Sequence, residues 1–268
     1  MITTLVCSFA LIISKRQDQV WPRFDLPKKP NSIASLWYQV NPEPLEPPHY
    51  SPKKFGEDKK QWEFPWIIAG NARLNGDSPA SDLKVRIYAQ EQKASKAPQV
   101  ARMLLRLYEF NVERFHLGHN PNYHKGLVDV FLCFGGKAGG EQLIDTETVD
   151  DPIYPGKKNI YQTNTIYIYD TSSFTDPVEM AREIAHEYGH ATWAHIGGFT
   201  EPEEWAEGYL AEKVYLRWFR DEMAKGVLTP DDAMGATVAG LDKWLADNAD
   251  PLILKGAQTL PIPEMLSD

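Results

Sequence analysis

The fold of this chain is decided by one stretch, Ala185-His186-Glu187-Tyr188-Gly189-His190, which has the pattern H-E-x-x-H. Residues four apart lie one above the other on an α-helix, so His186 and His190 can offer two imidazole nitrogens to one metal ion. Glu187 lies one position round the helix, where it can hold a water on that metal. Zinc (Zn2+) suits this set, because imidazole is a good zinc ligand and catalytic sites keep one position open for water. The pattern therefore predicts a zinc site for metal-assisted hydrolysis, with Glu187 as the catalytic base.

The flanking residues predict that this stretch lies in a helix. Asp176 can cap its start, Pro177 suits the first helical position and Glu179 completes a capping box. Apolar residues at every fourth position predict a core-facing stripe: Met180, Ile184 and Tyr188. Glycines at 197 and 198 predict its end. Gly189 costs the helix about 1 kcal/mol relative to alanine, and its missing side chain either lets another segment approach the metal or allows tight helix packing.

A catalytic zinc site needs a third protein ligand. A histidine six residues after the second would complete the metzincin pattern, but that position is Ile196, and His195 is one residue short. The other option is a carboxylate on the next helix. Residues 200–203 predict a capping box, and the run to about residue 225 favours a helix.

This second helix carries the segment Trp205-Ala206-Glu207-Gly208-Tyr209-Leu210-Ala211-Glu212, which resembles the W-x-E-G-x-x-A-E segment of gluzincins. Gluzincins are zinc metallopeptidases of the MA clan, with H-E-x-x-H on one helix and a glutamate ligand on the next. The resemblance covers residues 176–216 and implies a zincin-like metallopeptidase domain of the α+β class. In such a domain a small mixed sheet packs on the H-E-x-x-H active-site helix and the following glutamate-bearing helix.

The resemblance also implies roles for individual residues. Glu207, 17 residues after His190 (207 − 190), would be the third zinc ligand, and Glu212 would orient a histidine. Rival ligands are Glu203, Glu204 and Glu212. The implied activity is zinc-dependent hydrolysis of peptide bonds in a peptide or protein substrate. The substrate would pair with an edge strand beside the cleft, and either central strand could supply that edge.

One feature departs from gluzincins, which use a His or Tyr, usually downstream of the third ligand, to stabilise the oxyanion. No His follows His195, and the later tyrosines, Tyr209 and Tyr215, both lie on the glutamate-bearing helix. The candidates to substitute are Tyr154, Tyr161 and a residue in the 116–124 loop. Two further hypotheses stay open: a zinc-binding protein of the zincin fold without hydrolytic activity, and a binding module that acts through a proline-rich arm.

The remainder of the catalytic domain, residues 62–228, shows alternating strand and helix patterns. Strands are predicted at 83–90, 126–134 and 160–170, and an amphipathic helix at 98–117. Loops are predicted elsewhere: a mobile glycine-rich loop at 135–140, solvated histidines at 116, 119 and 124, and a solvated acidic loop at 145–151. Residues 229–268 are predicted to pack on the same domain, as a helix at 230–248 and a tail.

The N-terminal residues differ from the rest. Residues 1–13 are apolar and uncharged, and residues 1–17 predict a signal peptide and therefore export, to a secreted or periplasmic location. A buried strand is the alternative. The run is too short to cross a bilayer, so no stable membrane span is predicted in the mature chain. Residues 18–61 are rich in proline and charge and predict an extended arm, in which only 32–40 favours a short element.

Composition narrows the classes of function. The net charge of −9 opposes nucleic-acid binding, which needs basic patches. With 43% hydrophobic residues the chain has ample material for a core, and its length fits one domain with an arm. Removal of Cys7 with the signal peptide would leave only Cys133, so no internal disulfide is predicted. Nothing in the sequence predicts an oligomeric state.

Overall fold

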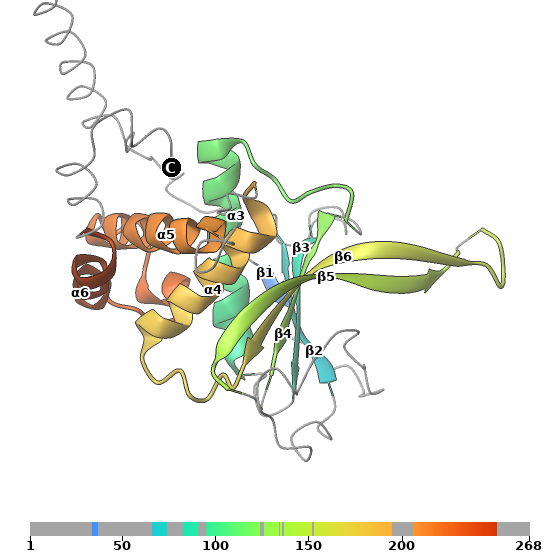
Figure 1. The fold of residues 1–268 in the computed structure, drawn as a ribbon, viewed down its shortest axis with the longest axis horizontal. Coiled ribbons are helices and arrows are strands. Elements are labelled where there is room, and N and C mark those ends of the chain that lie inside the picture. The colour runs from blue at the N-terminus through green and yellow to red at the C-terminus, as the bar shows by residue number, and fades with distance from the viewer. Residues whose placement is uncertain are drawn as a thin grey trace, which may run out of the picture. The chain divides into compact units, whose positions relative to one another are not determined.

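The described residues form one sheet from six strands: β1 (Ala34–Leu36), β2 (Trp66–Arg73), β3 (Leu83–Gln90), β4 (Val128–Leu132), β5 (Gly139–Asp150) and β6 (Lys158–Tyr169). Their order across the sheet is β1-β2-β3-β4-β6-β5 (Figure 1). The central strands β3, β4 and β6 run parallel, whereas the pairings of β1 with β2, β2 with β3 and β5 with β6 are antiparallel. The sheet is therefore mixed.

The computed structural model describes residues 34–36, 66–73, 83–90, 95–123, 126–133, 135, 137–151, 153–194 and 206–250. All of them belong to one compact unit, Asn31–Asp268. Strand β1 lies within the predicted arm, in the part that favoured a short element, and pairs with β2. The predicted signal peptide, the rest of the arm and the tail after residue 250 lie outside the described residues.

The helices follow the strands that position them. They are α3 (Ala97–Phe115), α4 (Pro177–Thr192), α5 (Ala206–Ala224) and α6 (Val238–Asn248), with a short 3-10 helix η5 (Pro230–Ala233). Helices α3 and α4 contact the sheet, α5 packs on α4, and α6 packs on α5 (Figure 1). The H-E-x-x-H helix thus lies between the sheet and the glutamate-bearing helix.

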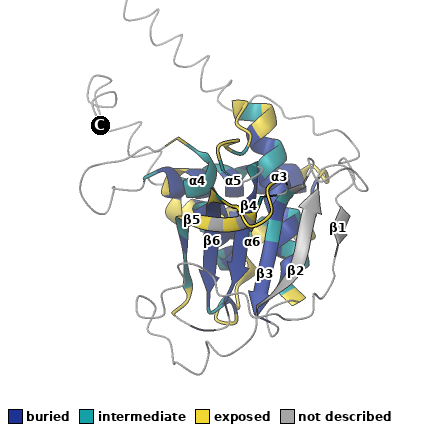
Figure 2. Cartoon of the chain, turned by 90° about the vertical axis from the view of Figure 1, so that its right-hand side faces the viewer, coloured by how far each residue is buried: buried dark blue, intermediate teal, exposed yellow. Residues whose placement is uncertain are grey.

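The two faces of the sheet differ in composition, and the difference decides where α4 packs. One face is aliphatic at its centre, with Ile87, Val130 and Ile166 in register. The same face carries Asn164, whose amide donates to the carbonyl of Ala191 at the end of α4 (2.6 Å). The other face carries stacked aromatic rings: Tyr88, Phe131 and Tyr167. Both sets are buried (Figure 2), and burial of the aliphatic side chains drives α4 onto its face.

The predicted mixed sheet is confirmed, and the arrangement of helices and strands is compatible with the predicted α+β class. The strands expected at 83–90, 126–134 and 160–170 are β3, β4 and β6, and the helix expected at 98–117 is α3. Within the described residues no helix is both long and apolar enough to span a membrane.

Strand β5 contradicts two predicted loops, because it occupies Gly139–Asp150. Its acidic residues disfavour a strand when considered alone. Here the Tyr169 hydroxyl donates to Glu141 (2.7 Å) and the Tyr167 hydroxyl donates to Asp145 (2.8 Å). Partners on β6 therefore stabilise acidic side chains that local preference would leave in solvent.

Two predicted helix boundaries are also wrong. Helix α4 ends at Thr192, before the glycines at 197 and 198, which lie outside the described residues. Two contacts hold this end of the helix, one made by its last residue, Thr192, and one by the next residue, Trp193.

 The Thr192 hydroxyl donates to the carbonyl of Tyr188 (2.7 Å), and the indole N–H of Trp193 donates to the Tyr215 hydroxyl (2.7 Å). The helix predicted at 230–248 is divided into η5 and α6, because Met234 and Gly235 adopt positive φ angles between them.

Candidate metal centre

Helix α4 carries the H-E-x-x-H residues, and its start follows from the local sequence. Asp176 caps it by accepting from the backbone N–H of Val178 (2.9 Å), and Pro177 occupies its first turn. A cap of this kind contributes about 1 kcal/mol. Glu179 accepts from Arg182 (3.1 Å) in place of the predicted capping box.

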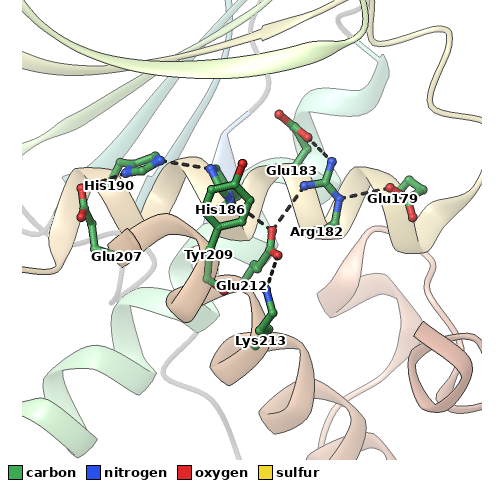
Figure 3. Close-up of polar contacts among 9 residues, drawn as sticks. All are labelled: Glu179, Arg182, Glu183, His186, His190, Glu207, Tyr209, Glu212 and Lys213. Atoms are coloured by element: carbon green, nitrogen blue, oxygen red, sulfur yellow. Dashed lines mark hydrogen bonds and ion pairs between the residues drawn. The ribbon is translucent and has the colours of Figure 1, made fainter. Parts of the chain in front are cut away.

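The two histidines of the motif face each other through their Nε2 atoms, which lie 3.0 Å apart (Figure 3). The other ring nitrogen of each contacts a carboxylate. His186 Nδ1 lies 3.1 Å from Glu212, and His190 Nδ1 lies 3.0 Å from Glu207. An ionised carboxylate only accepts, so each Nδ1 donates its hydrogen and each Nε2 keeps a lone pair. Two lone pairs therefore converge, as they do in histidines that a carboxylate orients toward a metal.

Gly208 of α5 keeps the space beside these nitrogens open. A Cβ at this position would lie 2.4 Å from His190 Nε2 and 2.9 Å from His186 Nε2. Two nitrogens of a tetrahedral zinc site lie about 3.3 Å apart, given Zn–N distances near 2.0–2.1 Å. The pair therefore needs to open by only a few tenths of an ångström, and its donor atoms fit zinc.

Glu207 does not complete this donor set in the structure. Its carboxylate lies on the Nδ1 side of the His190 ring, away from the two Nε2 atoms. In the described part of the chain, no three His, Cys, Asp or Glu side chains are grouped so that they could hold one ion. The rivals Glu203 and Glu204 lie outside the described residues, and Glu212 contacts the other histidine. The assignment of Glu207 as third ligand stays a prediction.

Glu187, the predicted base, is 4% exposed and lies against strand β5. A Cβ on Gly140 would lie 2.8 Å from Glu187 Oε1, so the backbone of β5 approaches this carboxylate closely because residue 140 is a glycine. Strand β5 is the last strand of the described sheet. The expectation that a central strand supplies the edge beside the cleft is therefore wrong, since β4 and β6 are both interior.

Glu212 lies in a network of charges on the Nδ1 side of His186. Its carboxylate, 3% exposed, also accepts from Arg182 (3.3 Å) and Lys213 (2.9 Å) (Figure 3). Burial alone would raise the pKa of Glu212, but the hydrogen bonds from His186 and Lys213 lower it below its ordinary value. Burial also lowers the pKa of His190, although its carboxylate partner opposes the shift. Glu212 is therefore an ionised acceptor that fixes the orientation of the His186 ring.

Gly189 of α4 allows the backbone of α5 to pack closely against α4. A Cβ there would lie 2.4 Å from the Cβ of Ala211 and 3.1 Å from the carbonyl oxygen of Glu207. The sequence left two explanations for this mid-helix glycine, approach of another segment to the metal and tight helix packing, and both apply here. Tight packing of α5 on α4 is also what brings Glu207 and Gly208 to the histidine pair.

Of the tyrosines that the structure describes, Tyr209 is the one that packs against a histidine of the pair. The ring of Tyr209 packs edge-on against His186, with ring centroids 4.6 Å apart, and the residue is 49% exposed (Figure 3). Tyr215 is buried, and its hydroxyl donates to Asn111 (2.8 Å). Tyr154 and Tyr161 belong to the β5–β6 hairpin. The sequence does not mark Tyr209 as part of the site, apart from its position between Glu207 and Glu212 on one helix.

The predicted solvated loop of histidines is wrong for His119. Its Nδ1 donates to the carbonyl of Gly126 (3.1 Å), and its Nε2 accepts from the hydroxyl of Tyr188 (2.7 Å). Burial lowers the pKa of His119 to about 4. His116 is exposed, as expected, and His124 lies outside the described residues. His119 therefore links the loop after α3 to α4 through Tyr188.

Together these residues offer two converging imidazole nitrogens, a buried carboxylate on the next position of the helix and a tyrosine that remains partly exposed. This set can bind a divalent metal and transfer a proton. No known protein family, curated protein or solved structure matches this chain.

Proposed function

We propose that this protein is a zinc-dependent peptidase of the zincin-like fold. One observation carries the proposal: the Nε2 atoms of His186 and His190 lie 3.0 Å apart, and each ring is held by a carboxylate at Nδ1. The mixed sheet with two stacked helices is compatible with a zincin-like domain. Glu207 becomes the third ligand if its carboxylate turns from the Nδ1 side of His190 to the Nε2 side.

Each residue of the site has a separate role in the proposed hydrolysis. A zinc ion held there would supply Lewis-acid polarisation of a peptide carbonyl and of a water. Glu187 accepts a proton from the attacking water and passes it to the leaving amine nitrogen. Glu212 holds the His186 ring in place. Tyr209, beside His186, is the side chain best placed to donate a hydrogen bond to the developing oxyanion.

The substrate would lie along β5. The outer edge of this strand starts at Gly139 and Gly140, beside the Glu187 carboxylate. An extended peptide can add to such an edge through backbone hydrogen bonds. This arrangement supports a peptide or protein substrate.

The test is Glu187→Gln, measured as hydrolysis of a fluorogenic peptide library beside zinc content. We expect a loss of about 10²–10⁴ in rate with zinc retained, since only the proton acceptor is removed. Glu179→Gln, in the first turn of the same helix and with a half-exposed side chain, is the matched control and should keep full activity. A fully active Glu187→Gln variant would remove Glu187 as the base.

A zinc-binding protein without hydrolytic activity is the second candidate. It is favoured by the position of Glu207 on Nδ1, which leaves two donors converging among the residues that the structure describes. Zinc at one per chain, with no cleavage of the library by the wild type, would select it. A binding module acting through residues 18–61 would instead keep its function in His186→Ala.

A further inference from the structure

Arg182 lies one turn before His186 on α4, and its guanidinium contacts three carboxylates (Figure 3). Two of them belong to the same helix: Nε donates to Glu179 (3.1 Å) and Nη2 donates to Glu183. The third is Glu212 of α5, which accepts from Nη1 (3.3 Å). Residues four apart share a face of a helix, so Arg182 and His186 lie on the same side of α4. Arg182 therefore joins α4 to the carboxylate that contacts His186.

The three carboxylates differ in burial, and the difference shows where Arg182 matters most. Glu183 and Glu212 are buried, whereas the side chain of Glu179 is half-exposed. An exposed ion pair contributes little, but an ionised carboxylate is costly to bury unless it is paired and hydrogen-bonded. The guanidinium of arginine stays charged and presents several donors in a rigid plane. The main effect of Arg182 is therefore on the two buried carboxylates.

Arg182 and His186 share one oxygen of Glu212. Nη1 of Arg182 lies 3.3 Å from Oε2 of this carboxylate, and Nδ1 of His186 lies 3.1 Å from the same atom. The other oxygen, Oε1, accepts from Lys213 (2.9 Å). Lys213 is the neighbour of Glu212 on α5, whereas Arg182 comes from α4, the helix of the histidines. Of these two cations, Arg182 is thus the one that holds the carboxylate relative to His186.

The position of this carboxylate decides which nitrogen of His186 carries the hydrogen. A neutral imidazole has two tautomers, and the hydrogen bond made by one nitrogen determines which tautomer is present. Glu212 at Nδ1 retains the hydrogen there and leaves a lone pair on Nε2, which faces Nε2 of His190. If the carboxylate withdrew, the hydrogen could move to Nε2, and that nitrogen would no longer be a metal donor. Arg182 therefore acts on this donor atom through Glu212.

We propose that Arg182 is a positioning residue of the metal centre: it holds Glu212 against Nδ1 of His186 and so keeps the Nε2 lone pair available to a metal ion. This inference deepens the proposed function and rests on it only where the lone pair is assigned to zinc. Arg182 contacts the carboxylate rather than the ring, so its effect is indirect. The alternative is that Arg182 only neutralises buried acids and stabilises the fold. The tautomer of His186 separates these two roles.

The experiment observes the imidazole rings by nitrogen NMR in the metal-free full chain with 15N-labelled histidine. At pH 8.5 an ordinary histidine is neutral, and the nitrogen shifts distinguish the atom that carries the hydrogen from the atom with the lone pair. The signals of His186 are identified by their loss in His186→Gln. In the wild type we expect the hydrogen of His186 on Nδ1. In Arg182→Met we expect much of it on Nε2, whereas His190, which contacts Glu207, should be unchanged.

Zinc affinity is the second measurement, made by competition against a chromophoric chelator. We expect Arg182→Met to weaken zinc binding by about tenfold or more, the usual effect of removing a group that orients a ligand. Arg220→Met is the matched control, because this arginine also contacts two carboxylates, those of Asp221 and Asp242. Its side chain is 23% exposed, compared with 24% for Arg182. The control should leave both the His186 tautomer and the zinc affinity unchanged.

A second variant guards against misfolding. Arg182→Met takes a cation away from buried Glu183 as well as from Glu212, so Arg182→Met combined with Glu183→Gln removes the first of these charges and isolates the effect on Glu212. The same change of tautomer is expected in the double variant. A folded double variant whose His186 keeps its hydrogen on Nδ1 would overturn the proposal, even if its unfolding midpoint falls, because Arg182 would then have a structural role alone. A wild type with this hydrogen on Nε2 would also overturn it.

The proposed function fails on different results. A His186 tautomer that depends on Arg182, in a wild type that binds zinc but hydrolyses no peptide, would retain the role of Arg182 and reject the peptidase. Zinc-dependent hydrolysis by the wild type, with a His186 tautomer that does not depend on Arg182, would retain the peptidase and reject the positioning role.

Discussion

Gly208 is the residue on which the metal space depends most directly. A Cβ here would lie 2.4 Å from His190 Nε2 and 2.9 Å from His186 Nε2. In Gly208→Ala we expect zinc affinity to fall by about tenfold or more, because the methyl group displaces the imidazole ends. The unfolding free energy should change little, since alanine favours the helix by about 1 kcal/mol and offsets the contact. The measurement is zinc competition against a chromophoric chelator.

Gly118→Ala is the matched control for that substitution. The nearest atom to its added Cβ is the Tyr108 hydroxyl at 3.7 Å, an ordinary contact. Its zinc affinity should equal that of the wild type. If Gly208→Ala also binds zinc normally, the ion does not lie between the two Nε2 atoms.

His119 makes stability depend on pH. Its pKa is about 4 when folded, below an ordinary 6.5, because burial opposes its charge. The unfolded chain therefore binds the proton more readily, and the contribution of His119 is complete above pH 6.5 and is lost as pH falls toward 4. The loss is at most about 3 kcal/mol. Urea unfolding at pH 7 and pH 4.5 should show a smaller difference in His119→Gln than in the wild type; equal differences would contradict this.

Among individual residues, the sequence predicted those whose positions depend on helical spacing alone. His186, Glu187 and His190 follow from the i, i+4 spacing that places two side chains on one face of a helix, and their arrangement on α4 agrees. Arg182 and Tyr209 could not be assigned, because their contacts with Glu212 and His186 arise only when α4 and α5 pack together. The sequence also could not predict the position of the Glu207 carboxylate, because rotation of this side chain can bring it to either nitrogen of the His190 ring.

The crossing of α4 and α5 is the decisive contact between elements. Gly189→Ala would place a Cβ 2.4 Å from that of Ala211, and overpacking of this kind costs about 1–3 kcal/mol. We expect net destabilisation despite the gain in helix preference, with weaker zinc binding because α5 must shift. Urea unfolding measures the loss of stability, and competition with a chelator measures the loss of zinc affinity.

Ala211→Gly in the same chain supplies the control, because it removes the shortest of these contacts. The double variant should recover part of the lost stability beyond the sum of the single changes. Strictly additive effects would mean that Gly189 is not required by the crossing.

Elements with a local signal were predictable, and those made by pairing were not. Asp176 and Pro177 specify the start of α4, and alternation specifies β3. Strand β5 carries glycines and acids that favour loops. It exists because β6 pairs with it and because the hydroxyls of Tyr167 and Tyr169 donate hydrogen bonds to its carboxylates. The end of α4 likewise depends on Trp193 reaching Tyr215, a contact between two helices.

For the molecule as a whole, the α+β class was an implication of the resemblance over residues 176–216, but nothing in the sequence predicted the order of the strands in the sheet. Strand β5 inserts after β4 in sequence and lies beyond β6 in space. This places the outer strand of the described sheet beside Glu187, which no pattern in the chain indicates. The fold thus joins a histidine pair, a buried glutamate and a long strand edge at one location.

Zinc content measured by plasma mass spectrometry on the purified wild type, beside Glu207→Ala, tests the central claim most directly. The account predicts about one zinc per chain in the wild type and a clear fall in the variant. Unchanged zinc in Glu207→Ala would give the third position to another carboxylate. A wild type that holds no zinc, even after incubation with excess Zn2+, would contradict the metal centre and the peptidase that depends on it.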